Sequence, residues 1–218
     1  GSDIYDAAVF LKGGNVLFEA AMQFPDLRFL DFGGGFKVAY SSEDKATDIP
    51  ELGRIVSAAF QEFCKTYGRQ LELWIEPGKF IVSEAGYLLV QATVVKETPT
   101  LNFVGVDSGL NHLIRPMMYD AYHHIYNLSN PTGDIYTYTV VGYICETDTL
   151  GSQRELNTVK EGDLLVIQNA GAYGFTMASN YNARPRPAEV LVWEGNIFLI
   201  REREQFEDLL RNQVSIDL

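Results

Sequence analysis

Two short segments carry the residue types that anion and cofactor chemistry needs, and each follows an apolar, strand-like run. Gly33-Gly34-Gly35 comes directly after the run 27–32. Glycines let an anion approach the backbone N–H groups because no Cβ obstructs it. A phosphate site and a flexible turn are both compatible with these three residues alone. Glu76-Pro77-Gly78-Lys79 follows the run 71–75 and combines a carboxylate, a rigid turn and a cation.

A glutamate at the end of a strand often contacts only solvent. Neither segment therefore establishes a cofactor site by itself. Together, an anion cradle and a carboxylate at the ends of two successive strands are more informative. The carboxyl ends of parallel strands are where α/β folds place their chemistry.

Three segments of the second half hold further candidates. Cys145-Glu146-Thr147-Asp148 combines a thiol with acids, but no histidine lies nearby in the sequence, so a Cys/His hydrolase is not indicated. A surface turn with solvated acids is the alternative. The run from Arg115 to Tyr119 is either an ordinary loop or an anion-binding arginine beside a phenol. Tyr173, in Gly171-Ala172-Tyr173, is either a site residue or a core aromatic with one buried hydrogen bond.

The first 85 residues show the alternation of helices and strands that is typical of a parallel α/β layer. Apolar residues recur at helical spacing over 7–24, although Gly13-Gly14 weakens the middle of that helix and predicts a possible interruption. Two short apolar runs, 27–32 and 71–75, are typical of strands buried on both faces. Between them, Asp48 is placed to cap a helix that ends at Gly68.

From residue 86 onward, β-branched and aromatic segments alternate with turn residues, which predicts an all-β domain with a sandwich or barrel core. We expect strands in 87–97, 102–108, 135–145, 162–169, 188–195 and 196–202, and a closing helix in 204–211. The last two strands are joined by Glu194-Gly195-Asn196 as a hairpin. The expected domains are therefore residues 1–85 and 86–218.

Composition excludes several partners. The chain has 218 residues, 46% of them hydrophobic, and a formal charge of -12, which repels nucleic-acid phosphates and anionic lipid surfaces. Neither nucleic acid nor a membrane is expected as a partner. Two cysteines and three histidines provide no structural metal spacing, so no metal is expected. The few thiols and the lack of a signal-like opening favour a reducing cytoplasm, and Cys64 is expected to be a buried apolar residue.

Taken in order, several segments resemble one family closely, over essentially the whole chain. FGGGFKVAY, IEPGKF, VDSGLNHLIRPMMYDAYHHI, CETD and NAGAYGFTMASNYNARPRP look like the carboxyl-terminal part of diaminopimelate decarboxylases, which use pyridoxal 5'-phosphate on an alanine-racemase-type barrel. The combination is far more specific than any one motif. The implied fold is the last strands and helices of a (β/α)8 barrel followed by a β domain. The opening Gly1-Ser2 resembles the family's H-x-G-S segment, and a vector-derived dipeptide is the alternative.

The resemblance also implies residue roles. The cofactor phosphate would be held by Gly33, Gly34 and Gly35, with Ser2 and the phenol of Tyr173. Glu76 would bond the pyridine nitrogen, and Gly78 of the same turn would also bind the cofactor. Carboxylates of a small amino-acid substrate would be bound by Lys79, Arg115 and Tyr119. Cys145 would protonate the carbanion formed by decarboxylation, and Glu146 would bind the distal amino group of the substrate. These two residues would act in the opposite subunit of a homodimer with shared active sites.

Two features depart from the family pattern. Lys79 stands where an arginine is usual, so the charge is kept without the bidentate fork. The family's Schiff-base lysine and ring-stacking histidine belong to an upstream half of the barrel, so this chain is not expected to decarboxylate by itself. A related decarboxylase for ornithine, arginine or carboxynorspermidine is an alternative, but such relatives usually carry Asp at the position of Glu146. A non-catalytic dimerisation module is the third reading.

Overall fold

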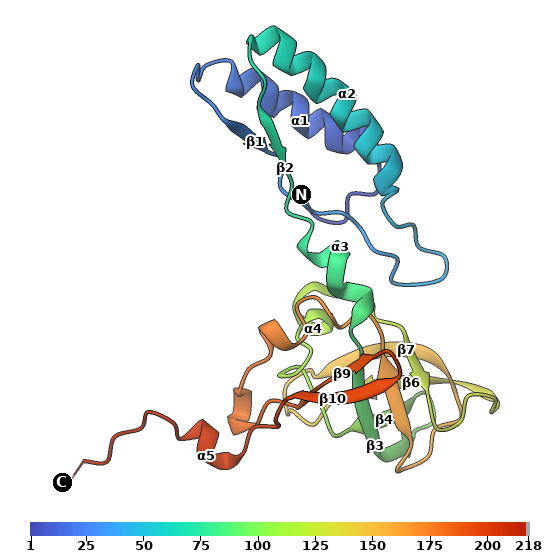
Figure 1. The fold of residues 1–218 in the computed structure, drawn as a ribbon. Helices are drawn as coiled ribbons and strands as arrows, with labels where there is room; N and C mark the ends of the chain where they lie inside the picture. The colour runs from blue at the N-terminus through green and yellow to red at the C-terminus, as the bar shows by residue number, and fades with distance from the viewer. Residues whose placement is uncertain (217–218) are drawn as a thin grey trace. The chain divides into compact units, whose positions relative to one another are not determined.

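The computed structural model describes residues 1–216, which form two compact units. The first unit is Gly1–Gly86, and the second begins at Tyr87. Figure 1 shows helices α1 and α2 side by side in the first unit and a curved sheet in the second. Among the described residues, no helix has both the length and the apolar character to span a membrane.

The helices of the first unit follow their predicted end signals. The Asp48 side chain accepts a hydrogen bond from the Glu51 N–H at the start of α2 (Ile49–Tyr67), and Gly68 ends this helix in a left-handed conformation with φ 84°. Helix α1 (Ala7–Ala21) is capped in the same way by Asp6 and runs unbroken. The predicted interruption at Gly13-Gly14 is therefore wrong. A Cβ at Gly14 would collide with the ring of Phe32, so this glycine serves close packing.

Two strands of the first unit pair in parallel. They are β1 (Phe29–Asp31) and β2 (Glu72–Trp74), with Leu30 opposite Leu73. Leu30 and Leu73 pack against the helices, in a cluster that includes the buried Cys64. On the other face, the rings of Phe29 and Trp74 stack at 4.0 Å and are exposed. The prediction that both faces of these strands are buried is thus wrong for this chain, because helices cover one face only. A short helix, α3 (Gly78–Val82), and a turn, η1 (Ser83–Ala85), follow.

The second unit is built on one six-stranded sheet with the order β5-β8-β3-β4-β6-β7. Its core is a single cluster of apolar side chains that includes Val104, Val140 and Leu165, all of which are fully buried. The short β5 and the long β7 were not among the predicted strands. The six strands are β3 (Leu88–Glu97), β4 (Asn102–Val106), β5 (Ile125–Asn127), β6 (Ile135–Val141), β7 (Thr149–Asn157) and β8 (Leu164–Ile167).

The remaining elements lie outside this sheet. The predicted hairpin is confirmed as β9 (Glu189–Trp193) and β10 (Asn196–Arg201), whose turn residues Glu194 and Gly195 both have positive φ. Its apolar side chains are exposed. The predicted closing helix is shorter than expected, α5 (Phe206–Leu209). Helix α4 (Arg115–Tyr119) and the turns η2 (Phe175–Met177) and η3 (Tyr181–Ala183) complete the unit.

The sheet core supplies a stability prediction. Leu165→Ala removes a fully buried side chain from the cluster, so the free energy of unfolding should fall by about 2–5 kcal/mol. Leu128→Ala is the matched control, because Leu128 is 49% exposed and its loss should cost little. Chemical denaturation of the full-length protein measures both changes. Equal effects of the two substitutions would contradict the assigned core.

Candidate active site

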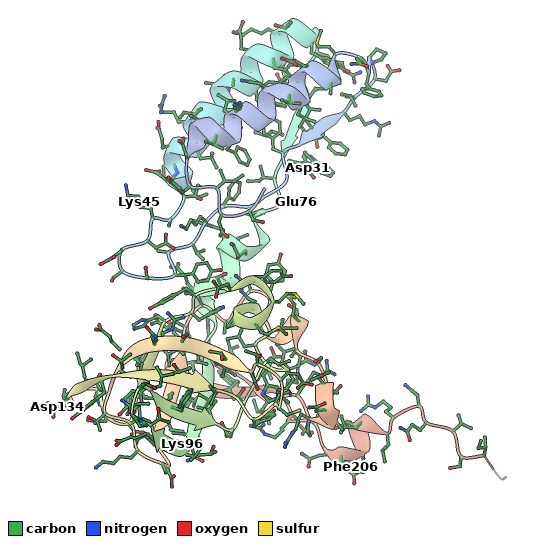
Figure 2. All side chains as sticks on the ribbon, turned by 180° about the vertical axis from the view of Figure 1, so that it is seen from behind. Asp31, Lys45, Glu76, Lys96, Asp134 and Phe206 are labelled. Atoms are coloured by element: carbon green, nitrogen blue, oxygen red, sulfur yellow. The ribbon has the colours of Figure 1, made fainter. Side chains whose placement is uncertain are left out.

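The two parallel strands of the first unit end in turns that hold each other. The Glu76 N–H donates to the carbonyl of Gly33 at 2.7 Å, and the Gly33 N–H donates to the Asp31 carboxylate at 2.8 Å. Figure 2 labels Asp31, the last residue of β1, and Glu76, which follows β2, and the two lie near each other. A Cβ at Gly34 would collide with the carbonyl oxygen of Glu76. Residue 34 must therefore be glycine for the turns to approach this closely.

The glycine turn can hold an anion, but with fewer donors than the sequence suggested. The Gly33 N–H is already bonded to Asp31, whereas no described residue accepts from the N–H groups of Gly34 and Gly35. Gly35 has φ 87° and lies against the opening segment, since its carbonyl accepts from the Ile4 N–H at 2.9 Å. A Cβ at Gly35 would collide with the Gly1 carbonyl, which places Ser2 beside the turn. The result is two free amides in a cradle that only glycine permits.

The Glu76 turn presents an exposed carboxylate. The Gly78 N–H bonds back to the Glu76 carbonyl at 2.9 Å, so Gly78 stabilises the turn and starts α3. Lys79 forms an ion pair with Asp3 and lies 5.6 Å from the centre of the Tyr40 ring. Its charge is thus already partly neutralised within the first unit.

In the second unit, helix α4 carries the predicted arginine, Arg115, which is buried, and the predicted tyrosine, Tyr119, which is exposed. Arg115 is 8% exposed, and its guanidinium lies 6.0 Å from the centre of the Tyr173 ring. The structure therefore brings Arg115 and Tyr173 together. Tyr173 is itself half-exposed and has a left-handed backbone with φ 58°, which is costly for a non-glycine residue. Tyr119, at the end of the helix, is exposed.

The turn that carries Cys145 and Glu146 meets a loop distant in the sequence. The Tyr181 hydroxyl donates to Glu146 Oε1 at 2.6 Å, and the Cys145 thiol lies 3.4 Å from Glu146 Oε2. The Asn182 amide lies 3.9 Å from Cys145 Sγ. The hydrogen bond from Tyr181 lowers the pKa of the Glu146 carboxyl, which favours its ionised form. Tyr181 lies in the segment NAGAYGFTMASNYNARPRP, which carries part of the family resemblance, but no role was predicted for it.

Asp148 stabilises the turn that carries Cys145 and Glu146. Its buried carboxylate accepts from the Leu110 N–H at 2.7 Å and from the Ile144 N–H at 3.0 Å. A Cβ at Gly109 or Gly142 would collide with it. Burial raises the pKa of Asp148, and the two backbone hydrogen bonds act in the opposite direction. Asp148 thus joins the loop that precedes Arg115 to the turn that carries Glu146. No role was predicted for it from the sequence.

The histidines have structural surroundings. His123 is fully buried and its Nδ1 donates to the Gln168 carbonyl at 2.8 Å, while burial lowers its pKa to about 4. His112 contacts Ser108 and the Pro185 carbonyl, and burial lowers its pKa as well. Both rings are therefore neutral near pH 7. No cluster of metal ligands occurs among residues 1–216.

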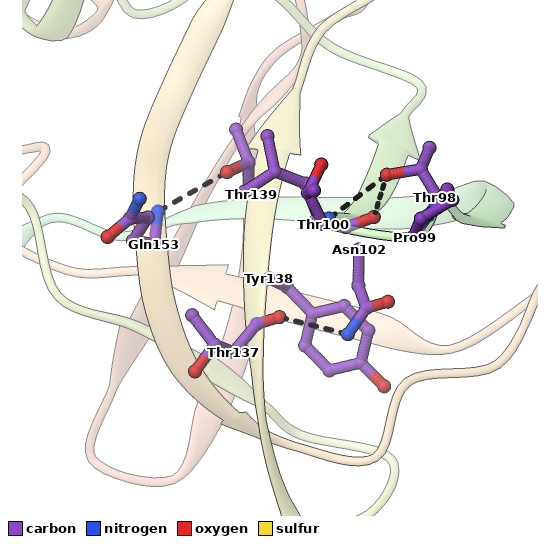
Figure 3. A pocket seen from close by; sticks show the side chains of 9 residues that line it. Thr98, Pro99, Thr100, Asn102, Thr137, Tyr138, Thr139 and Gln153 are labelled. Carbon is purple, nitrogen blue, oxygen red and sulfur yellow. Dashed lines mark hydrogen bonds between the residues drawn. The ribbon is translucent and has the colours of Figure 1, made fainter.

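The second unit also contains a polar hollow. Figure 3 shows it between the start of β4 and the middle of β6, lined by residues such as Thr98, Asn102 and Gln153. Its volume is about 360 Å³. The Asn102 amide donates to the Thr137 carbonyl at 3.3 Å inside it. None of the residues expected to act in catalysis lines this hollow.

Comparison with known proteins assigns the family. Residues 5–171 match the model of the pyridoxal-dependent decarboxylase C-terminal sheet domain. The chain belongs to the pyridoxal-dependent decarboxylases. A diaminopimelate decarboxylase of Methanothermobacter thermautotrophicus is 41% identical over 98% of this chain and 51% of that protein. One of Neisseria meningitidis serogroup B is 48% identical over 87% of this chain and 44% of its own length. The chain thus spans about half the length of these curated relatives.

Solved structures agree with this assignment and confirm the predicted fold class. A diaminopimelate decarboxylase from M. jannaschii, in complex with L-lysine, has a TM-score of 0.88 and 34% identity, covering 99% of this chain and 50% of that one. A lysine/ornithine decarboxylase from Vibrio vulnificus has a TM-score of 0.71 at 22% identity and shows a shared fold only. The family's name states a dependence on pyridoxal, which implies the expected cofactor, pyridoxal phosphate.

The residues of the first unit fit such a cofactor. Its phosphate needs N–H donors without obstruction, and Gly34 and Gly35 offer two. Its ring nitrogen needs an acid, and Glu76 is exposed on the adjacent turn. Gly33 was expected to bind the phosphate, but its N–H donates to the Asp31 carboxylate. Gly33 therefore shapes the turn.

The close approach of the two turns can be tested by Gly34→Ala. The added methyl group collides with the Glu76 carbonyl and pushes the turns apart, so affinity for pyridoxal phosphate should fall about tenfold or more. Gly13→Ala is the matched control, since a Cβ there meets nothing within 4 Å. Absorbance titration of the full-length protein with cofactor measures the affinity. Unchanged affinity in Gly34→Ala would remove this turn from the cofactor site.

Proposed function

We propose that the full-length protein decarboxylates meso-diaminopimelate to L-lysine with pyridoxal phosphate. The observation that carries the proposal is the Cys145–Glu146 pair, an exposed thiol and carboxylate on one turn with Tyr181 bonded to the acid. Diaminopimelate decarboxylases at 41% and 48% identity support the choice of substrate. So does the lysine complex of a structural relative, because lysine is the product of that reaction.

The residues of the first unit are assigned to the cofactor. The amides of Gly34 and Gly35, with Ser2 nearby, bind the phosphate, and Gly33 and Gly78 shape the turns that flank it. Glu76 keeps a proton on the pyridine nitrogen. The protonated ring supplies the electron sink that accepts the pair of electrons left by carbon dioxide. Glu76 would act by its negative charge, from a turn that the Gly33 carbonyl holds in place.

The residues of the second unit are assigned to the substrate and to proton delivery. Arg115 binds a carboxylate with its fork of N–H donors, Tyr119 adds a hydroxyl, and Tyr173 is a further phosphate ligand. Glu146 binds the distal ammonium group of diaminopimelate. Cys145 delivers a proton to the carbon that has lost its carboxylate. Lys79 is the weakest assignment for carboxylate binding, since Asp3 already pairs with it.

The proposal includes a homodimer in which Cys145 and Glu146 serve the site of the opposite subunit, and a barrel portion supplied by the rest of the protein. A cytoplasmic location follows from the sparse cysteines and is likewise a proposal. An assay of the full-length protein with meso-diaminopimelate, ornithine, arginine and carboxynorspermidine tests the function. We expect carbon dioxide release from diaminopimelate, at an efficiency well above the other three. Preference for any of the others would contradict the substrate assignment.

The role of Glu76 gives a separable prediction. Glu76→Gln removes the charge that keeps the ring nitrogen protonated, while the glycine amides still bind the phosphate. Turnover should fall by about a hundredfold or more, with cofactor affinity changed far less. Glu84→Gln, another exposed acid of the same unit, is the control. Loss of cofactor with normal turnover of the loaded enzyme would show that the role is wrong.

The role of Glu146 predicts a loss of substrate recognition only. Glu146→Asp withdraws the carboxylate by one methylene, about 1.5 Å, which breaks a charge-assisted hydrogen bond to the distal ammonium. The kcat/KM for diaminopimelate should drop about ten- to a hundredfold, with cofactor binding unchanged. Glu161→Asp, an exposed acid in the turn before β8, serves as the control. Steady-state kinetics with a cofactor titration decides this, and an equal loss of cofactor would place Glu146 outside the substrate site.

A further inference from the structure

We infer that Tyr181 is a positioning residue that aims the Glu146 carboxylate at the distal amino group of the substrate. This inference rests on the proposed function, which gives Glu146 its ligand. The direct observation is the 2.6 Å hydrogen bond from the Tyr181 hydroxyl to Glu146 Oε1, made between residues 35 apart in the sequence. Without this bond, Glu146 is an exposed, flexible side chain on a surface turn.

The loop that carries Tyr181 is itself anchored at several points. The Ser179 N–H donates to the Asn111 carbonyl at 2.8 Å, and the Asn180 amide donates to Glu204 at 2.6 Å. Glu204 is held in turn by the guanidinium of Arg186. These contacts fix the backbone on both sides of Tyr181, so its hydroxyl reaches Glu146 from a rigid base.

The backbone after Tyr181 is strained. Asn182 and Ala183 have φ of 53° and 54°, a left-handed conformation that is unfavourable for alanine. Such a conformation persists only where surrounding contacts impose it, and it concentrates at functional sites. Here it directs the Tyr181 hydroxyl to Glu146 and the Asn182 amide toward Cys145, at 2.6 and 3.9 Å. One strained loop thus reaches both residues of the turn.

The pair has the chemistry to select an ammonium group. The Tyr181 hydroxyl donates a hydrogen bond to Glu146. The phenol oxygen and the remaining carboxylate lone pairs can then still accept hydrogen bonds. An ammonium has three N–H donors and no acceptor, so it can bond to both residues, whereas a carboxylate would be repelled. The hydrogen bond also lowers the pKa of Glu146 and raises that of Tyr181, which keeps the acid charged and the phenol protonated.

Tyr181→Phe in the full-length holoenzyme tests this inference, because it removes one hydroxyl and keeps the ring. We expect KM for diaminopimelate to rise about three- to tenfold, with kcat within about twofold. The acid-side decline of kcat/KM should move to higher pH, because Glu146 loses the bond that lowers its pKa. Cofactor content and the thermal unfolding midpoint should stay the same. Tyr136→Phe is the matched control, since Tyr136 on β6 is 48% exposed and Tyr181 is 44% exposed.

Three outcomes would overturn the inference. An unchanged KM and pH profile in Tyr181→Phe means that the hydroxyl does not aim Glu146. An equal rise of KM in Tyr136→Phe, or a parallel loss of cofactor and thermal stability in Tyr181→Phe, means a structural effect. Failure of the unaltered enzyme to act on diaminopimelate would instead contradict the proposed function, and this inference with it.

Discussion

A single buried carboxylate fixes the geometry on which the proposed substrate chemistry depends. Asp148 accepts hydrogen bonds from the N–H groups of Leu110 and Ile144, one on the loop that leads to Arg115 and one on the turn that carries Glu146. Burying a charge is costly unless hydrogen bonds compensate it, and an apolar replacement would leave two backbone donors without a partner. The glycines at 109 and 142 leave room for this carboxylate. Asp148 therefore holds the loop before Arg115 and the turn that carries Glu146 together within one subunit, although in the proposed homodimer these two residues serve different sites.

The first unit uses a comparable constraint without a buried charge. The Gly33 carbonyl and the Glu76 N–H are bonded, and the missing Cβ of Gly34 lets the two strand ends approach. In both units, backbone contacts hold the loops while exposed side chains remain available for chemistry. This division of roles explains why rigid turns surround Glu76 and Glu146, whose carboxylates are themselves accessible.

Much of this could be predicted from the sequence, because local signals were strong. Asp48 and Gly68 bound α2, and Glu194-Gly195 joins β9 to β10, since capping and turn chemistry depend on nearby residues. The strand β7 was missed because LGSQREL has no clear alternation of apolar residues, and its place depends on pairing with β6. The roles of Tyr181 and Asp148 could not be predicted, because each contacts a loop more than 30 residues away. The occupied N–H of Gly33 was equally hidden, since an aspartate side chain competes with a ligand there.

The most direct test of this account is a crystal structure of the full-length protein with pyridoxal phosphate and lysine bound. We predict that the lysine amino group farther from the cofactor lies about 3 Å from the Glu146 carboxylate of one subunit, within hydrogen-bonding distance. Tyr181 should remain bonded to the other carboxylate oxygen. Lysine bound with that amino group on a different acceptor, and Glu146 turned away from it, would contradict the account.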